Sequence, residues 1–230
     1  MSKLSLQLPQ GDSGALEVRS VRRMGISQAA VAKRAFDILV ATTSLALLSV
    51  LLLIVASAIL IMQGRPILIR HPRVGKGGAM FPCFKFRTMV RDADAALVRH
   101  LAKDPGAMLE WQATRKLKND PRVTPLGKIL RETSLDELPQ LLNIIRGEMS
   151  VVGPRPIVTQ ELIRYGSAIA EYQSVRPGLT GLWQCSGRSD TSYDERVMLD
   201  REYVRHWSMT GDLAIILRTV PALMSSRGVY

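Results

Sequence analysis

One long uncharged segment dominates the hydrophobic pattern of the chain. Residues 38–62 contain no charged side chain, and Asp37 and Arg65 lie on either side of them. At about 1.5 Å per residue, a helix of this length can cross a hydrocarbon core of about 30 Å. A cleaved signal peptide is a weaker alternative, because the segment is too long and follows a polar tail. The pattern predicts three parts: a polar N-terminal tail (residues 1–32), a membrane helix (33–64) and a more polar domain (65–230).

The remaining pattern predicts a mostly helical α+β domain with one short β-hairpin. Two strands are expected at 67–70 and 81–87, separated by a glycine-rich turn. The expected helices cover residues 92–100, 157–172, 193–207 and 212–224, with an exposed connector at 111–120 and a turn at 177–181. The last helix is apolar on one broad face. It can pack in the core or lie in the membrane interface, and we favour the interface.

The second strand carries two cations beside two aromatic residues. Strand alternation puts Phe84 and Phe86 on one face and Lys85 and Arg87 on the other. The simplest explanation for the two cations is a strand face in contact with water. The alternative is that they converge on a phosphate group.

The charge balance favours anionic partners. The chain has 31 lysines and arginines against 20 aspartates and glutamates, a net charge of +11. Nucleic acid, an anionic membrane surface and phosphate-bearing substrates all suit this balance. The basic residues occur without a helix-turn-helix, zinc-finger or RNA-binding aromatic motif, so we expect no nucleic-acid partner. The two cysteines, Cys83 and Cys185, predict no disulfide framework, which fits a reducing compartment.

Basic residues flank the apolar segment on both sides. Arginines and lysines occur within residues 19–34 before it and within 65–76 after it. Lysine and arginine prefer the cytoplasmic side of a membrane. A helix that enters the bilayer, bends and returns keeps both clusters on that side, whereas a spanning helix places one of them across the membrane. These residues alone leave both arrangements open.

The segment from Arg131 to Gln140 contains two adjacent carboxylates, Asp136 and Glu137, and has two explanations. Ser134-Leu-Asp-Glu137 matches a capping box, and a helix N-terminus favours carboxylates through its dipole. A phosphoryl-transfer site is the second explanation, because it combines a carboxylate with cations that hold phosphate oxygens. Suitable cations occur at Arg131, Arg155 and Arg176, the last two beside prolines. If the second explanation holds, these residues alone predict a phosphate-handling enzyme and nothing more specific.

Other groups of possible metal ligands give weaker signals. Asp92 and Asp94 match the Asp-x-Asp pair that binds metal in many nucleotide-sugar glycosyltransferases. On a helix, residues two apart do not face each other, so we interpret the pair as surface. The three histidines, His71, His100 and His206, lack the spacing of a zinc site.

Six segments, taken in order, form a distinctive set. They are Lys33-Arg34-Ala-Phe-Asp37, Arg73-Val-Gly75, Lys85-Phe-Arg-Thr-Met89, Thr133-Ser-Leu-Asp-Glu-Leu-Pro-Gln-Leu141, Ser150-Val-Val-Gly-Pro-Arg-Pro156 and Val175-Arg-Pro-Gly-Leu-Thr-Gly181. Together they resemble the bacterial sugar transferase family, the monotopic polyprenyl-phosphate phosphoglycosyl transferases. The resemblance covers roughly residues 33–225 and is greatest to members that start exopolysaccharide repeat units.

The resemblance implies a two-step transfer through a covalent intermediate. Asp136 would attack the sugar-bearing phosphorus of a UDP-sugar and release UMP, and the phospho-sugar would then pass to undecaprenyl phosphate. Asp136 and Glu137 would bind Mg²⁺, which screens the diphosphate, or Glu137 would assist the second step. The cations expected to hold the substrate phosphates are Lys85, Arg87, Arg131, Arg155 and Arg176.

One position departs from the family pattern. The family commonly has a Ser-Pro pair where the membrane helix turns back, and this chain has Ser49-Val50. Without proline, hydroxyl groups such as those of Thr42 and Ser49 bend a helix more gently. The basic flanks and the resemblance still favour a re-entrant helix over a spanning one. The catalytic domain is then expected on the cytoplasmic face of the bacterial inner membrane, in contact with lipid.

Two other functions stay open at this point. A membrane-bound, Mg²⁺-dependent nucleotide-sugar hydrolase or phosphatase would use the same groups with water as acceptor. A non-catalytic scaffold would recruit partners through its basic surface, although a scaffold needs no carboxylate pair. The sequence does not encode which sugar is transferred or whether the protein is a homodimer.

Overall fold

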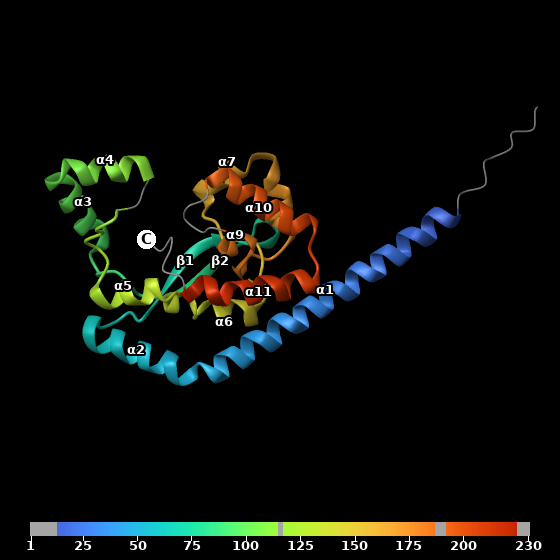
Figure 1. Ribbon diagram of the computed structural model, residues 1–230, viewed down its shortest axis with the longest axis horizontal. Coiled ribbons are helices and arrows are strands. Elements are labelled where there is room, and N and C mark those ends of the chain that lie inside the picture. Colours follow the sequence, from blue (N-terminus) through green and yellow to red (C-terminus); the bar gives the residue numbers. More distant parts are fainter. Residues whose placement is uncertain (1–12, 115–116, 187–191, 225–230) are drawn as a thin grey trace, which may run out of the picture. The chain divides into compact units, whose positions relative to one another are not determined.

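The computed structural model describes residues 13–114, 117–186 and 192–224 (Figure 1). Two compact units are present, Met1–Phe36 and Asp37–Tyr230. As predicted, the structure is mostly helical, and it contains two small two-stranded sheets.

Most of the described elements are helices, and the strands among them are short. The helices are α1 (Ser13–Leu47), α2 (Ser49–Gln63), α3 (Ala93–Lys103), α4 (Pro105–Thr114), α5 (Pro125–Glu132), α6 (Gln140–Arg146), α7 (Leu162–Tyr165), α8 (Ile169–Ser174), α9 (Leu182–Cys185), α10 (Tyr193–Arg205) and α11 (Met209–Met224). The strands are β1 (Leu68–Val74), β2 (Met80–Phe86), β3 (Ser150–Val152) and β4 (Gly178–Thr180). Four 3₁₀ turns are η1 (Lys76–Gly78), η2 (Leu135–Glu137), η3 (Thr159–Glu161) and η4 (Gly166–Ala168).

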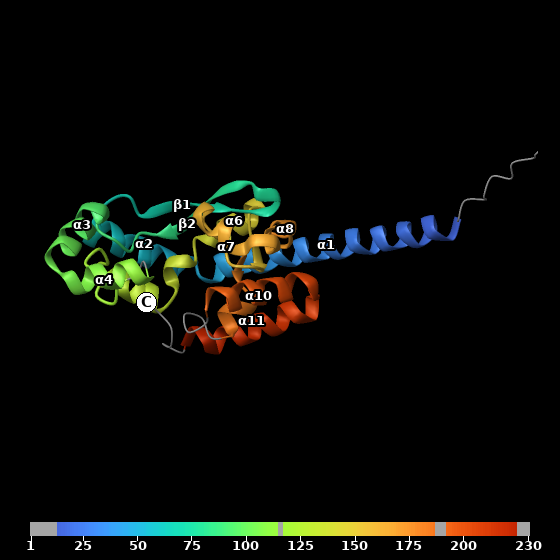
Figure 2. The same cartoon turned by 90° about the horizontal axis from the view of Figure 1, so that it is seen from above.

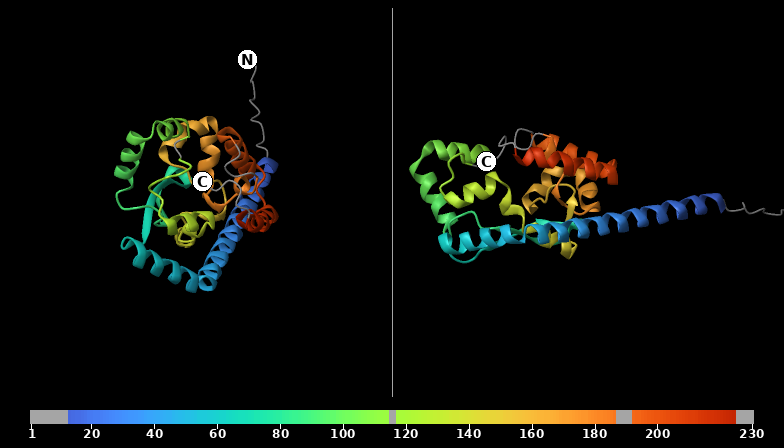
Figure 3. Two further views of the ribbon diagram at one scale, coloured as in Figure 1. Left: turned by 60° about the vertical axis from the view of Figure 1, so that its left-hand side comes forward. Right: turned by 60° about the horizontal axis from the view of Figure 1, so that its bottom comes forward.

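The apolar segment, predicted as one helix, forms two helices that meet at Leu48 (Figure 3). No single helix in the described ranges is long and apolar enough to cross a membrane. Among the described helices, the pair Gln28–Leu47 and Ser49–Gln63, bent by 63°, passes that test together. The bend is sharper than we expected without proline. At the break the Ser49 hydroxyl donates to the Ala46 carbonyl at 2.8 Å, so a side chain competes for the helical ladder there.

The protein covers only one side of α2. Val55 and Ile59 are buried and pack in a cluster with Phe86 and Leu130. The large exposed side chains of this apolar helix are Val50, Leu53, Ile54, Leu60, Ile61 and Met62. A contiguous apolar surface of this kind marks a site of contact with membrane or protein.

β1 and β2 form the predicted antiparallel hairpin, with Leu68 opposite Phe86 and Val74 opposite Met80. Gly77 takes a positive φ of 68° in the turn, a conformation that glycine adopts without strain. Phe84 and Phe86 are both buried as expected, but Phe81 and Cys83 on the other face of β2 are buried as well, so both faces of the strand are covered. β1 extends further than the predicted strand at 67–70.

A parallel pair, β3 with β4, replaces the turn predicted at 177–181. Close backbone approach explains why glycines occur here. A Cβ added to Gly178 would lie 2.1 Å from the Gly153 nitrogen, and one added to Gly153 would lie 2.5 Å from the Arg176 carbonyl. The contact therefore brings together the two loops that carry Arg155 and Arg176.

Asp37, the first residue of the second unit, connects α1 to β3. Its carboxylate is fully buried and accepts hydrogen bonds from the Ser150 hydroxyl and the Val151 N–H, both at 3.0 Å. Ala41, one turn further along α1, is buried in the main core with Met149. The last turns of α1 are thus built into the same unit as the hairpin.

The C-terminal helices match their predicted positions, whereas the helix predicted at 157–172 is broken. Gly166 takes a φ of +48°, ends α7 and begins the 3₁₀ turn η4 that leads into α8, while η3 precedes α7. Part of the connector predicted at 111–120 belongs to α4. α10 and α11 lie side by side (Figure 2), and the Tyr203 hydroxyl of α10 donates to Asp212 of α11 at 3.0 Å.

Candidate active site

The two carboxylates lie in a tight turn between α5 and α6. Ser134 takes a left-handed conformation with a φ of +56° and makes no capping hydrogen bond. The capping box predicted for Ser134 to Glu137 is therefore wrong, because the left-handed residue leads into a 3₁₀ turn and not into an α-helix. Asp136 and Glu137 lie in that turn, and α6 begins after Pro139.

Lys85 of β2 joins the two carboxylates. Its Nζ donates to Glu137 Oε1 at 2.6 Å and lies 3.8 Å from Asp136 Oδ2. The Asp136 side chain is 11% exposed and that of Glu137 is 35% exposed. The hairpin thus supplies a cation to a carboxylate pair that lies more than fifty residues further along the chain.

Burial and the lysine set the charge of the pair. Burial raises the pKa of Asp136 to about 6, against the opposing effect of Lys85. Burial also acts to raise the pKa of Glu137, but Lys85 and Arg155 outweigh it, so this pKa lies below its ordinary value. At neutral pH both groups are mostly ionised. Asp136 is the more basic of the two, which favours it as an oxygen nucleophile.

A cavity with an empty volume of about 370 Å³, part of it open to solvent, lies beside Lys85 and Glu137. Two further cations line it, Arg73 and Arg155. The other lining residues are Cys83, Gln140, Pro156, Gly178, Leu179 and Gln184. The predicted site did not include Arg73. Strand register offers the signal, because Arg73 pairs with Phe81 and so shares the hairpin face of Lys85.

Arg87 lies outside this cavity. It is 4% exposed, and its Nη2 donates to the carbonyls of Gln63 at 2.6 Å and Gly64 at 2.8 Å. These carbonyls end α2, where backbone acceptors have no helical partner. The structure gives Arg87 the role of a C-terminal cap, and its assignment to substrate phosphate stays a prediction.

Of the remaining two predicted cations, Arg131 lies close enough to affect Asp136, and Arg176 lies outside the cavity. Arg131 Nε donates to Thr88 Oγ1 at 3.0 Å, and its charge acts to lower the pKa of Asp136. Arg176 Nε donates to the Gly147 carbonyl at 2.7 Å and does not line the cavity. Lys85, Arg131 and Arg155 are therefore the predicted cations that the structure brings near the carboxylates.

Side chains of α9 and α10 hold Arg155, although no role at the site was predicted for either helix. Its guanidinium lies 5.0 Å from the Trp183 ring centre, and that of Arg196 lies 5.2 Å from the same ring. The backbone N–H of Arg155 donates to Asp200, which also accepts from the Tyr165 hydroxyl at 2.7 Å. These contacts position the Arg155 loop from its inner side.

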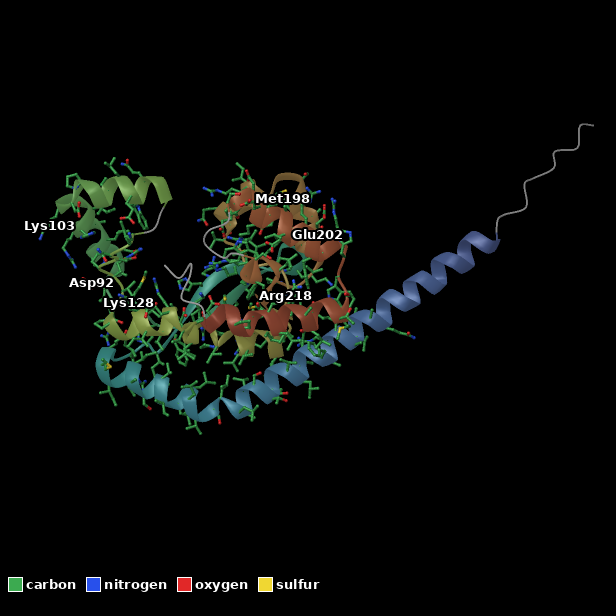
Figure 4. The ribbon with its side chains drawn as sticks, in the orientation of Figure 1. Asp92, Lys103, Lys128, Met198, Glu202 and Arg218 are labelled. Carbon is green, nitrogen blue, oxygen red and sulfur yellow. The ribbon has the colours of Figure 1, made fainter. Side chains whose placement is uncertain are left out.

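The buried face of α10 could have been found from spacing. Arg196, Val197, Asp200 and Tyr203 recur every three to four residues and are all buried. Met198 and Glu202 lie on the outer side of the same helix (Figure 4). Charged residues on the inner face gave the helix its mixed polarity and obscured this pattern.

Asp200 should make the protein less stable as the pH rises. Burial raises its pKa from 3.8 to about 6, so its contribution is complete below about pH 3.8 and lost as the pH rises through 6. Asp200→Asn keeps the shape but cannot ionise. We expect the free energy of unfolding to fall less between pH 5 and pH 8 in this variant than in the wild type. The fall in the wild type should exceed the fall in the variant by about 1.4 kcal/mol in detergent-solubilised protein.

A matched control is Asp94→Asn, which changes an exposed aspartate on α3. It should keep the wild-type difference in stability between the two pH values. Equal pH dependence in Asp200→Asn and the wild type would mean that Asp200 does not titrate in this range.

The carboxylate pair suits Mg²⁺ when substrate phosphates and water supply the other ligands. No group of three or more histidine, cysteine, aspartate or glutamate side chains could hold a metal within the described ranges. Asp136 and Glu137 offer carboxylate oxygens, and Mg²⁺ commonly adds water and substrate phosphates to one or two such ligands. Asp92 is exposed and bonded by Arg99 at 2.6 Å, which confirms that the Asp-x-Asp pair is surface.

Comparison with known proteins identifies the family. The sequence model of the family described as "Bacterial sugar transferase" matches residues 28–226, a range that includes the carboxylate pair and every cation discussed above. The chain belongs to the bacterial sugar transferase family. It is therefore a transferase, as the sequence motifs predicted.

Similar proteins carry related names. The chain is 51% identical over 214 residues to the "Exopolysaccharide production protein ExoY" of Rhizobium meliloti, covering 93% of each chain. It is 46% identical to the "Undecaprenyl-phosphate galactose phosphotransferase" of Salmonella typhimurium, covering 86% of this transferase and 41% of that protein. It is 42% identical to the "UDP-glucose:undecaprenyl-phosphate glucose-1-phosphate transferase" of Caulobacter vibrioides, covering 86% of this chain and 72% of that protein.

Proposed function

We propose that this transferase moves a hexose 1-phosphate from a UDP-sugar to undecaprenyl phosphate and releases UMP. The observation that carries the proposal is the contact of Lys85 with Glu137 and Asp136 beside a cavity lined by Arg73 and Arg155. The names of the relatives support the same substrates. The reaction would be the first membrane step of exopolysaccharide synthesis, and the name of the Rhizobium relative supports a role in exopolysaccharide production.

In the first step, an Asp136 oxygen attacks the phosphorus that bears the sugar. The bond from this phosphorus to the bridging oxygen breaks, and the electron pair leaves with UMP. Asp136 suits this role because burial raises its pKa to about 6, so it is basic for a carboxylate yet mostly ionised at neutral pH. Lys85, Arg73 and Arg155 would stabilise the negative charge on the phosphate oxygens.

In the second step, an oxygen of undecaprenyl phosphate attacks the same phosphorus. The bond to Asp136 breaks, the carboxylate is restored, and the lipid-linked diphosphate sugar leaves. Bound Mg²⁺, held by Asp136 and Glu137 with substrate phosphates, would supply charge neutralisation. Lys85 contacts Glu137 at 2.6 Å, and this ion pair orients the Glu137 carboxylate.

A panel of UDP-sugars tests the function directly. Detergent-solubilised protein is incubated with undecaprenyl phosphate, Mg²⁺ and each UDP-sugar, and both UMP and lipid-soluble sugar are measured. The proposal requires that the two products form in equal amounts. UMP release without lipid product would identify a hydrolase that uses water as acceptor. The relatives' names differ between galactose and glucose, so the panel also identifies the sugar.

We further propose that the bent pair α1–α2 enters the inner membrane and returns, with the catalytic unit on the cytoplasmic face. The 63° bend and the uncovered apolar side of α2 support this arrangement. A single cysteine at Ser13, in a background where Cys83 and Cys185 are serine, should react only with reagents that reach the cytoplasm. Labelling of this cysteine from the periplasm alone would show that the segment spans the membrane.

A further inference from the structure

Two glutamine side chains line the cavity, and one of them has an amide oxygen without a hydrogen-bond partner. Gln140 begins α6, is 3% exposed and lines the cavity. Gln184 lies on α9, and its Oε1 is buried without a hydrogen-bond partner. Buried polar groups are nearly always paired, and an unpaired one is costly. The unpaired Gln184 oxygen, with a second amide lining the same cavity, therefore indicates a ligand that supplies a partner.

Their position indicates which part of a ligand they meet. Gln140 follows Glu137 by three residues, and both side chains line the same cavity. If the proposed function is correct, the reacting phosphorus lies beside these carboxylates. The sugar is bonded directly to that phosphorus through one oxygen, whereas the second phosphate and the ribose separate the uracil from it. Among the described lining residues there is no aromatic ring on which a base could stack.

The chemistry of the amides suits the same part of the donor. The cations Arg73, Lys85 and Arg155 account for the phosphates, which carry the charge. A side-chain amide is neutral and offers both a donor and an acceptor, and a sugar hydroxyl does the same. Rotation of the terminal bond of Gln184 exchanges its oxygen and nitrogen, so either can face the cavity.

We infer that Gln140 and Gln184 bind hydroxyl groups of the transferred sugar and determine which sugar is accepted. This inference rests on the proposed function, since it needs the sugar phosphate beside Glu137. The amides come from two separate elements, α6 and α9. They can therefore read two different hydroxyl groups.

The test combines glutamine variants with donors that lack single hydroxyls. The probes are UDP-glucose and UDP-galactose with their 2-, 3-, 4- and 6-deoxy analogues. In the wild type, removal of a bonded hydroxyl should lower kcat/KM about 10-fold. In Gln184→Ala, kcat/KM for the parent donor should fall about 10-fold. It should fall no further with the analogue that lacks the hydroxyl bound by Gln184. Gln140→Ala should behave in the same way with a different analogue.

Controls separate binding from folding. Gln184→Met keeps the size of the side chain without its hydrogen bonds and should repeat the result for alanine. Gln160→Ala changes an exposed glutamine in η3 and should keep the full discrimination of the wild type. Inhibition by UMP, which lacks the sugar, should be unchanged in every variant.

Two results would overturn the inference. One is that the ratio of kcat/KM between the parent donor and each deoxy analogue is the same in each variant as in the wild type. The other is weaker inhibition by UMP, which would place the amides on the nucleotide. Calorimetry measures the affinities of UDP-sugar and of UMP without turnover. The difference between them reports the contribution of the part of the donor that UMP lacks, which includes the sugar. If the wild type releases no lipid product but this contribution is lost in the variants, the proposed function fails while the sugar site stands.

Discussion

Asp136→Asn is expected to abolish formation of the lipid-linked sugar, with a loss of turnover of about 10⁴-fold or more. Asparagine has nearly the same shape, but its amide cannot form the acyl phosphate that the two-step reaction needs. Folding should not suffer, because burial already disfavours the charge that the substitution removes. The measurements are UMP release and sugar recovered in the organic phase, together with the amount of protein in the membrane fraction.

Two comparisons make this result specific. Asp94→Asn removes an exposed carboxylate on α3 and should retain full turnover. Glu137→Gln should lose less, about 10²-fold, since this residue supports the reaction and does not form the covalent bond. Full activity in Asp136→Asn would remove the proposed nucleophile, and a labelled phospho-enzyme in that variant would point to another residue.

Gly178→Ala should prevent stable folding of the catalytic unit. A Cβ at this position would lie 2.1 Å from the Gly153 nitrogen and 2.3 Å from the Thr180 carbonyl, distances that side chains do not reach. Both atoms belong to the backbone of the β3–β4 pairing and cannot move without breaking it. We expect a loss of about 4 kcal/mol or more in the free energy of unfolding. Thermal unfolding in detergent measures the effect.

Gly106→Ala is the matched control for this prediction. An added Cβ there would lie 3.2 Å from a single atom, the flexible carboxylate of Asp104. Gly106 lies in α4, where alanine is the better helix former, so stability should be equal or slightly higher. A folded, fully active Gly178→Ala variant would show that β3 and β4 do not approach as closely as described.

Local patterns predicted the elements that depend on local physics. The hairpin followed from strand alternation around Phe84 and Phe86, which are buried as expected. α10 and α11 were predicted close to their observed bounds, and the broad apolar face of residues 212–224 indicated the second of them. The carboxylate pair and Lys85 could be selected because their residue types match the chemistry. The contact between them, at 2.6 Å from Lys85 to Glu137, needed the structure.

The errors came from features that depend on contacts distant in sequence. Ser134 looked like a helix cap, but its left-handed backbone leads into a 3₁₀ turn. The turn predicted around Gly178 became a strand because β3, far earlier in the chain, pairs with it. Arg87 looked like a phosphate ligand from its strand position. Its partners are two carbonyls at the end of α2, which no spacing within the strand could indicate.

The contact of Arg87 with the end of α2 links the position of the active site to the position of the apolar helix. Arg87 follows Lys85 by two residues, a distance of about 7 Å along an extended chain. The lysine that joins the carboxylates is thus attached, through one short piece of backbone, to the residue that closes the apolar helix. If α2 lies in the bilayer, its depth sets the height at which chemistry occurs. A long isoprenoid lipid would then need to raise only its phosphate to that level, while its tail stays among the other lipids.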